Sequence, residues 1–173
     1  GAPAAERVKR IAVFIGGTDR FSLGEQVAAC ADRVFTDCEI LLIGRGYEER
    51  VEQTPGGNQM RYSPLKPDTV PFLRNLDLLL SGGGYVKYEA SYACVPNAAV
   101  SQTEEQRADT LLLKNEGLLE DLGLAESFEA DRFESELARL AETGVRKAML
   151  EAAARVFVTD SDLEAGREIV ALL

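Results

Sequence analysis

The chain has 173 residues, which suits one domain of about 100 to 200 residues, and its 46% hydrophobic and 28% charged content is ordinary for a globular protein. This composition argues against a disordered chain. The 29 acidic residues outnumber the 19 Lys and Arg, and the net charge of −10 disfavours binding to the phosphate backbone of nucleic acids.

The chain contains no histidine, so it offers no histidine general base, no Ser–His or Cys–His pair and no histidine metal ligand. Cys30, Cys38 and Cys94 fit no zinc spacing, and we expect reduced, buried thiols in a cytoplasmic protein. No apolar run reaches the roughly 18 residues of a membrane span, and the start does not resemble a signal peptide. We expect no metal site, no membrane span and no nucleic-acid partner.

The first strong element is a buried strand at Ile11–Ile15, which ends in Gly16-Gly17. We expect residues 1–10 to be a linker or residues left from the expression vector, and residues 11–173 to form one folded domain. A helix should follow, with Ser22 and Glu25 at the spacing of a capping box and apolar positions continuing to Phe35. A second buried strand is predicted at Glu39–Ile43.

The rest of the chain alternates strands and helices before it becomes mostly helical. Predicted strands are Met60–Ser63, Asp77–Ser81 and Asn97–Ser101, and predicted helices are Asp68–Asn75, Tyr85–Cys94, Glu104–Gly117, Asp131–Thr143, Val145–Phe157 and Asp160–Leu173. We expect Leu111–Leu113 and Leu118-Leu119 to belong to the core, with an interface to a partner protein as the alternative. Strands separated by helices imply parallel crossovers. The predicted fold is a single α/β, Rossmann-like, doubly wound domain with a mostly parallel sheet and a helical C-terminal region.

Two glycine-rich loops follow predicted strands, Gly82-Gly83-Gly84 and Gly16-Gly17-Thr18. Glycine lets backbone amides approach a ligand closely, and a helix start adds unpaired N–H groups that suit a phosphate or diphosphate. The alternative is a tight strand–helix connector with no ligand. Neither loop matches a dinucleotide fingerprint or a P-loop.

Glu89 lies about one and a half turns into the helix that follows Gly84, at roughly 3.6 residues per turn. A carboxylate there could accept hydrogen bonds from a ribose diol while the loop holds phosphates. Tyr85 shares its face of the helix. The alternative for Glu89 is an ordinary solvated helix residue.

These motifs resemble the C-terminal half of glycosyltransferases with the GT-B architecture. The closest resemblance is to the UDP-sugar hydrolase of pseudaminic acid synthesis and to spore-coat polysaccharide synthesis proteins, and a more distant one is to the N-acetylglucosaminyltransferase of peptidoglycan synthesis. The stretches that carry the resemblance are Ser81–Glu89, Cys94-Val95-Pro96, Ser101, Glu105-Gln106, Ile11–Asp19, Glu39–Gly46, Val158–Asp160 and Ala165–Val170.

The resemblance implies that residues 11–173 form a nucleotide-sugar-binding domain with a site for a UDP-sugar, with UDP or UDP-sugar as a substrate ligand and no further cofactor. Gly16, Gly17 and Thr18 would face the diphosphate, and Gly83, Gly84 and Tyr85 would supply amides from the helix start. Glu89 would bind the ribose hydroxyls, the loop at Leu65–Asp68 would border the uracil through Leu65, and Glu105 and Gln106 would approach the diphosphate or the sugar.

The sequence also departs from the family. Tyr85 and Val86 stand where Ser or Thr is usual, and Cys94 replaces a small glycine before Val-Pro. Nothing corresponds to the N-terminal domain that carries the acceptor site and the catalytic residue, so we expect that domain as a missing partner and assign no catalytic residue here. The expected function is nucleotide-sugar binding as half of a transferase or hydrolase. The alternatives are an interaction domain that has lost its ligand and a flavodoxin-like or nicotinamide-binding domain.

Overall fold

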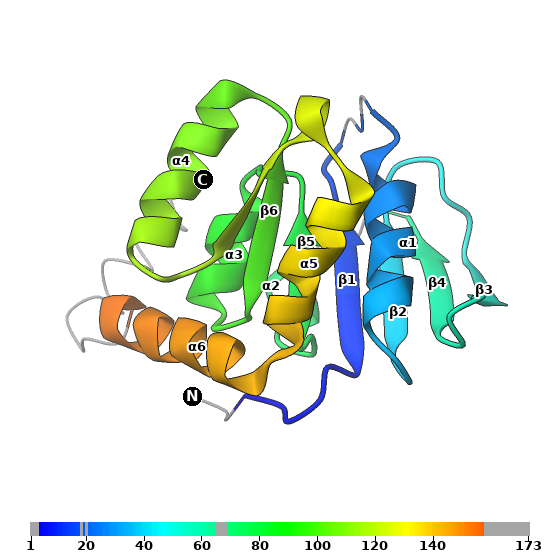
Figure 1. The fold of residues 1–173 in the computed structure, drawn as a ribbon, viewed down its shortest axis with the longest axis horizontal. Coiled ribbons are helices and arrows are strands. Elements are labelled where there is room, and N and C mark those ends of the chain that lie inside the picture. Colours follow the sequence, from blue (N-terminus) through cyan, green and yellow to red (C-terminus); the bar gives the residue numbers. More distant parts are fainter. Residues whose placement is uncertain (1–3, 18, 20, 65–68, 158–173) are drawn as a thin grey trace.

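The computed structural model describes residues 4–17, 19, 21–64 and 69–157, and in them one seven-stranded sheet lies between helices (Figure 1). The strand order is β3-β4-β2-β1-β5-β6-β7, and every neighbouring pair is parallel except β3 with β4. The strands are β1 (Arg10–Phe14), β2 (Glu39–Ile43), β3 (Arg50–Gln53), β4 (Gln59–Ser63), β5 (Leu78–Ser81), β6 (Asn97–Ser101) and β7 (Glu120–Leu124).

Helices cover both faces of the sheet, with α1 and α5 in front of it and α2 and α3 behind it in Figure 1. The predicted doubly wound α/β fold with a mostly parallel sheet is therefore confirmed. The helices are α1 (Leu23–Val34), α2 (Thr69–Leu73), α3 (Val86–Tyr92), α4 (Glu104–Asn115), α5 (Ala130–Ala141) and α6 (Thr143–Phe157), with a 3₁₀ turn at Ala125–Ser127.

The central strands are apolar at successive positions because each face of the sheet has its own core. In β1, Ile11 and Val13 pack with α1 and α5, whereas Ala12 packs with α2 and α3. Side chains alternate between the faces of a strand, so a strand covered on both sides needs a continuous apolar run. The same alternation holds in β2, where Ile40 and Leu41 belong to opposite cores.

Two edge strands are missing from the sequence-based prediction. All four residues of β3 are exposed, so its sequence carries no apolar signal, and it is held by antiparallel pairing with β4. The strand β7 interrupts the C-terminal region that was expected to be helical between α4 and α5. Its first residue, Glu120, is flanked by Lys114 and Arg139. The residues of β3 are exposed and those of β7 are half-buried, so neither strand has the continuous apolar run of a fully buried strand.

The leucines in α4 and directly after it are only partly buried. Leu118 and Leu119 are buried as expected, but Leu111 and Leu112 are exposed, which corrects the prediction that they belong to the core. A run of three leucines in a helix points in three directions, since successive residues are about 100° apart, and α4 packs on β6 and β7 with one face.

Two of the three cysteines are buried, and none forms a disulfide. Burial raises the pKa of the Cys30 and Cys38 thiols to about 11 each. Cys94 is half-buried and has a positive φ of 55°. Its backbone conformation is the one that glycine prefers at the residue after a helix end.

The chain before β1 packs on the body of the domain: Val8 is buried, and the guanidinium of Arg146 donates to the Ala5 carbonyl oxygen at 2.7 Å. The helix predicted at Asp160–Leu173 lies outside the described residues. In the part of the chain that the structure describes, no helix combines the length and apolar character needed to cross a membrane.

Candidate functional site

The strands β1 and β5 lie side by side at the centre of the sheet, where the order of connections reverses (Figure 1). From β1 the chain proceeds to β2 on one side, and from β5 it proceeds to β6 on the other. In doubly wound folds ligands bind beyond the carboxyl ends of such strands, because the diverging connections leave a crevice. The loops that begin at Gly16 and Gly82 therefore flank the expected ligand position.

Both glycine loops line one open cleft of about 470 Å³, and the loop after β6 completes its wall. The only charged residue in its described lining is Glu89. Among the residues with described positions, no cluster of three Cys, Asp or Glu side chains is placed to hold a metal ion. The lining consists of Phe14, Ile15, Gly16, Gly17, Gly84, Tyr85, Val86, Glu89, Gln102, Thr103 and Gln106.

A larger groove of about 650 Å³ lies between α1 and the β3–β4 hairpin. Its buried carboxylate, Asp32, is already bound by Thr54, Gly56 and Asn58. None of the described residues that the sequence predicts for a site lines this groove. The smaller cleft is therefore the candidate site, although it is not the largest.

The glycines at the cleft have two different roles. A Cβ atom at Gly82 would lie 2.0 Å from the Ile15 carbonyl oxygen, and one at Gly83, whose φ is +78°, would lie 2.8 Å from the Ser101 hydroxyl. A Cβ atom at Gly17 or Gly84 would meet no atom within 4 Å. A tight strand–helix connection thus explains Gly82 and Gly83, whereas Gly17 and Gly84 border open space that a ligand can enter.

The start of α1 is capped by the protein itself. The Asp19 carboxylate accepts hydrogen bonds from the amides of Leu23 and Gly24, both at 2.7 Å. Ser22 has a left-handed backbone with φ of 50° and makes no side-chain cap, so the predicted capping box of Ser22 and Glu25 is wrong. Because these two amides are bonded within the protein, they are not open to an anion in the cleft.

The loop after β6 is fixed by two glutamines. The backbone amide of Gln102 donates to the side-chain oxygen of Gln106 at 2.9 Å, and the Gln102 side chain donates to the Ile15 carbonyl at 3.1 Å. Thr103 caps α4 by accepting from the Gln106 amide at 3.2 Å. Glu105 is exposed, and hydrogen bonds from its own amide and from Thr103 lower its pKa, so its carboxylate turns to the helix start.

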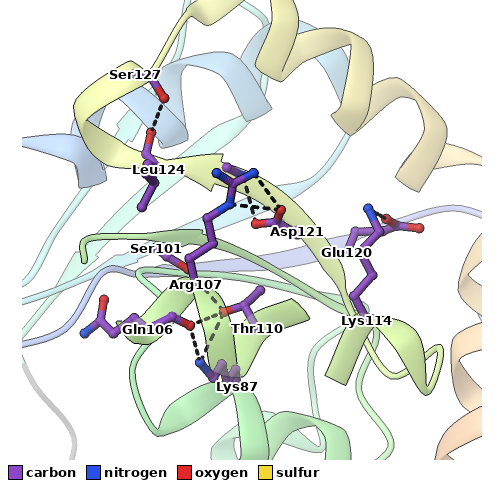
Figure 2. Close-up of polar contacts among 11 residues, drawn as sticks. Lys87, Ser101, Gln106, Arg107, Thr110, Lys114, Glu120, Asp121, Leu124 and Ser127 are labelled. Carbon is purple, nitrogen blue, oxygen red and sulfur yellow. Dashed lines mark hydrogen bonds and ion pairs between the residues drawn. The ribbon is translucent and has the colours of Figure 1, made fainter. Parts of the chain in front are cut away.

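A buried lysine lies behind the cleft wall. The Lys87 ammonium donates to the Gly83 carbonyl at 2.8 Å, the Gln106 carbonyl at 3.0 Å and the Thr110 hydroxyl at 3.1 Å. Figure 2 shows its nitrogen pointing toward Gln106 and Thr110 on α4. The side chain thus joins the loop after β5 to the first turns of α4.

Six of the predicted site residues share the cleft: Gly16, Gly17, Gly84, Tyr85, Glu89 and Gln106. Gly83 lies behind the wall and Glu105 lies outside it, while Thr18 and Leu65 fall outside the described residues. Gln102, Thr103 and Lys87 were not predicted. The local sequence gives Lys87 no distinguishing signal, because two of its three partners lie on another helix.

No protein-family model and no curated protein matches the sequence. Solved glycosyltransferases share its fold. The spinosyn rhamnosyltransferase SpnG, complexed with thymidine diphosphate, has a TM-score of 0.67 at 18% identity over 88% of this chain and 42% of that chain. SnogD from Streptomyces nogalater has a TM-score of 0.60 at 23% identity over 99% and 45% of the two chains.

The spinosyn forosaminyltransferase SpnP matches with a TM-score of 0.66 at 18% identity over 96% of this chain and 44% of that chain. At these identities the likeness shows the fold alone. The expected resemblance to glycosyltransferases is therefore confirmed at the level of fold. The chain spans less than half of the length of each of these proteins.

Proposed function

We propose that this chain binds the nucleoside diphosphate of a nucleotide-sugar donor, as the C-terminal half of a glycosyltransferase. The observation that carries the proposal is the single cleft of about 470 Å³ that both glycine loops form where the strand connections diverge. Small-molecule sites usually have volumes of about 300–1,000 Å³. The shared fold with glycosyltransferases, one of them complexed with thymidine diphosphate, supports the proposal.

The diphosphate would be held mainly by backbone amides. Gly17 and Gly84 border open space, so their backbones are accessible to phosphate oxygens. Gly16, Gly83 and Tyr85 would extend this surface, together with Thr18. Gln106 would approach the diphosphate or the sugar from the opposite wall, with Glu105 next to it. Amide donors allow a chain of net charge −10 to hold an anion without a basic patch on the surface.

The nucleoside would be recognised by Glu89, whose half-buried carboxylate lies in the cleft lining. An ionised carboxylate has only acceptor oxygens, which suits the two hydroxyl donors of a ribose. Leu65 would border the base. A site that binds both ribose hydroxyls favours a uridine nucleotide, since the deoxyribose of thymidine diphosphate has a single free hydroxyl to donate.

The whole enzyme would need a further, N-terminal domain with the acceptor site and the catalytic residue, and no catalytic residue is assigned in residues 11–173. Leaving-group charge would be stabilised in the cleft by the amides. The resemblance to the pseudaminic acid and spore-coat proteins favours a more specific function, a hydrolase with water as the acceptor. Such an enzyme would act in polysaccharide synthesis.

Calorimetric titration with UDP, a UDP-N-acetylhexosamine and thymidine diphosphate tests the proposal. We expect Glu89→Gln to weaken UDP binding about tenfold, which corresponds to about 1.4 kcal/mol, and to weaken thymidine diphosphate binding less. Glu116→Gln, an exposed change at the far end of α4, is the matched control and should bind like the parent. Absence of heat with all three nucleotides at millimolar concentration would refute the proposal.

A second candidate is an interaction domain that has kept the fold and lost the ligand. The observation that favours it is the 87% exposure of Tyr85 at the cleft mouth. Large exposed aromatic side chains are common in protein interfaces. A thermal-shift screen separates the two functions, because a ligand at 100 times its dissociation constant stabilises the folded state by about 2.7 kcal/mol, whereas a domain without a ligand gives no shift.

A further inference from the structure

The Lys87 side chain is 1% exposed, although lysine is among the residues that proteins bury least. It projects from α3, yet two of its three partners lie on α4. Neither the fold nor the resemblance requires a lysine at this position, where an apolar side chain would fill the same space without desolvating a charge. Its burial therefore calls for a compensating interaction.

Its three partners suit the protonated form of the side chain. The carbonyl oxygens of Gly83 and Gln106 can only accept hydrogen bonds. The Thr110 hydroxyl donates its own proton to the Gln106 carbonyl at 2.8 Å and so receives one from Lys87. The ammonium form has the three protons that these three hydrogen bonds use.

Among the described residues, no carboxylate lies within ion-pair distance of this ammonium. Asp109 acts on it from a greater distance and favours its charge, while burial lowers the pKa of Lys87. The three acceptors are neutral oxygens. A buried cation without a counter-ion is strongly destabilised, so an anion close by would be held in compensation.

The ammonium lies directly behind residues that line the cleft. Gly83, whose carbonyl it binds, directly precedes Gly84 of the lining, and Gln106, whose carbonyl it also binds, is itself a lining residue. The described lining contains a single charged side chain, the negative Glu89. No positive side chain stands on the described lining, and the Lys87 ammonium is a positive charge with fixed geometry directly behind it.

We infer that Lys87 is a positioning residue for the diphosphate of the donor: its ammonium holds the loop after β5 against α4 and provides the fixed positive charge that the phosphates meet through the cleft wall. The inference rests on the proposed function. It assigns recognition of phosphate charge to a side chain that makes no contact with the ligand. Because Lys87 is 1% exposed, its charge is screened less than the charge of a surface lysine would be.

The test compares Lys87→Met, which keeps an unbranched side chain one atom shorter and removes its charge, with Lys114→Met, which makes the same change at an exposed position on α4. Calorimetry with UDP, UMP and uridine measures how affinity depends on phosphate charge. We expect Lys87→Met to weaken UDP binding about tenfold and uridine binding less than about twofold, with UMP between them. Lys114→Met should leave all three affinities at the parental value.

Equal losses for UDP and uridine in Lys87→Met would mean that the residue only supports the cleft, and they would overturn the inference. Unchanged affinity for all three ligands would overturn it as well, while the proposed function would stand. If the parent binds neither UDP nor thymidine diphosphate, the proposed function fails and the inference fails with it.

A second measurement uses the parent fold, in case Lys87→Met unfolds. UDP affinity should fall as the pH rises through the lowered pKa of Lys87, because the ammonium loses its charge, and uridine affinity should not. The groups that face Lys87 are Asp109 on α4 and Tyr88 on α3, whose ring centre is 5.2 Å from the ammonium nitrogen. Because the Tyr88 hydroxyl can also titrate, the dependence of UDP affinity on pH is measured again in Tyr88→Phe. A profile that disappears in this variant, or that uridine shares, would contradict the inference.

Discussion

The side-chain amide of Gln102 donates to the carbonyl oxygen of Ile15 across 3.1 Å. This hydrogen bond joins the loop after β6 to the loop after β1, although β5 lies between the two strands. The loop after β5 is thereby enclosed on both sides. The two glycine loops consequently line one continuous surface.

The same Ile15 carbonyl limits what can stand at residue 82. Gly82→Ala would place a Cβ atom 2.0 Å from that oxygen, so backbone must move, and we expect a loss of about 3 kcal/mol in the free energy of unfolding. Urea denaturation measures it. Gly84→Ala is the matched control, because its Cβ atom meets nothing within 4 Å, and it should change stability by less than about 0.5 kcal/mol. Equal losses in both variants would contradict this account.

Cys94 ends α3 in a conformation that suits glycine. The amide of Val95 donates to the Ala90 carbonyl and the amide of Cys94 to the Ser91 carbonyl, the pattern of a Schellman motif. A left-handed residue with a side chain costs about 1–2 kcal/mol, so Cys94→Gly should stabilise the domain by about 1 kcal/mol.

Ala93→Gly is the control for Cys94→Gly, since residue 93 has an ordinary helical φ of −72°. Glycine there gains nothing sterically and should destabilise by about 1 kcal/mol. Thermal unfolding of both variants gives the comparison. A decrease in stability for Cys94→Gly would show that the half-buried thiol contributes more through packing than its backbone costs.

Asn58 connects α1 to the chain before β2 and is 1% exposed. Its amide nitrogen donates to the Phe35 carbonyl at 2.8 Å, and its oxygen accepts from the Cys38 amide at 3.0 Å. Asn58→Ala would leave buried backbone groups without partners, at about 1–3 kcal/mol for each, and we expect a loss of at least 2 kcal/mol. The exposed Asn75, whose side chain donates to the Pro71 carbonyl, gives the control Asn75→Ala, which should change the free energy of unfolding little in chemical denaturation.

Asp32 gives the domain a defined response to acid. Burial alone would raise the pKa of this carboxyl, but hydrogen bonds from Thr54, Asn58 and Gly56 outweigh it and hold the pKa below its usual value. A depressed folded-state pKa stabilises the fold above the unfolded-state pKa, and this contribution is lost as the pH falls through the folded-state value.

Asp32→Asn should therefore be less stable than the parent at pH 7, and the two should converge as the solution is acidified. Melting temperatures of parent and variant across the acid range provide the measurement. A constant difference between the two at every pH would exclude this role for Asp32.

The sequence predicts the centre of the fold well because burial on both faces leaves a strong pattern in β1, β2 and β5. The edge strands β3 and β7 escape prediction since backbone pairing, and not apolar side chains, defines them. The capping error at Ser22 has a similar origin. Asp19 lies farther from the helix than a local motif allows, and only the path of the loop brings its carboxylate to the first amides.

The candidate site was predictable where glycine marked it and not where tertiary contacts made it. Gly16, Gly17 and Gly84 were found from their place after strands. Gln102 and Lys87 act through partners 87 and 23 residues away along the chain, respectively, and no local pattern reveals such contacts. Glu105 shows the converse, since its place in the motif suggests the cleft while its hydrogen bonds keep it at the helix start.

A cleft walled by main chain also constrains the sequence very little. Any residue contributes an amide, so substitutions around Gly17 and Gly84 can accumulate while the shape of the crevice persists. A sequence motif is therefore a weaker marker of this kind of site than the path of its backbone.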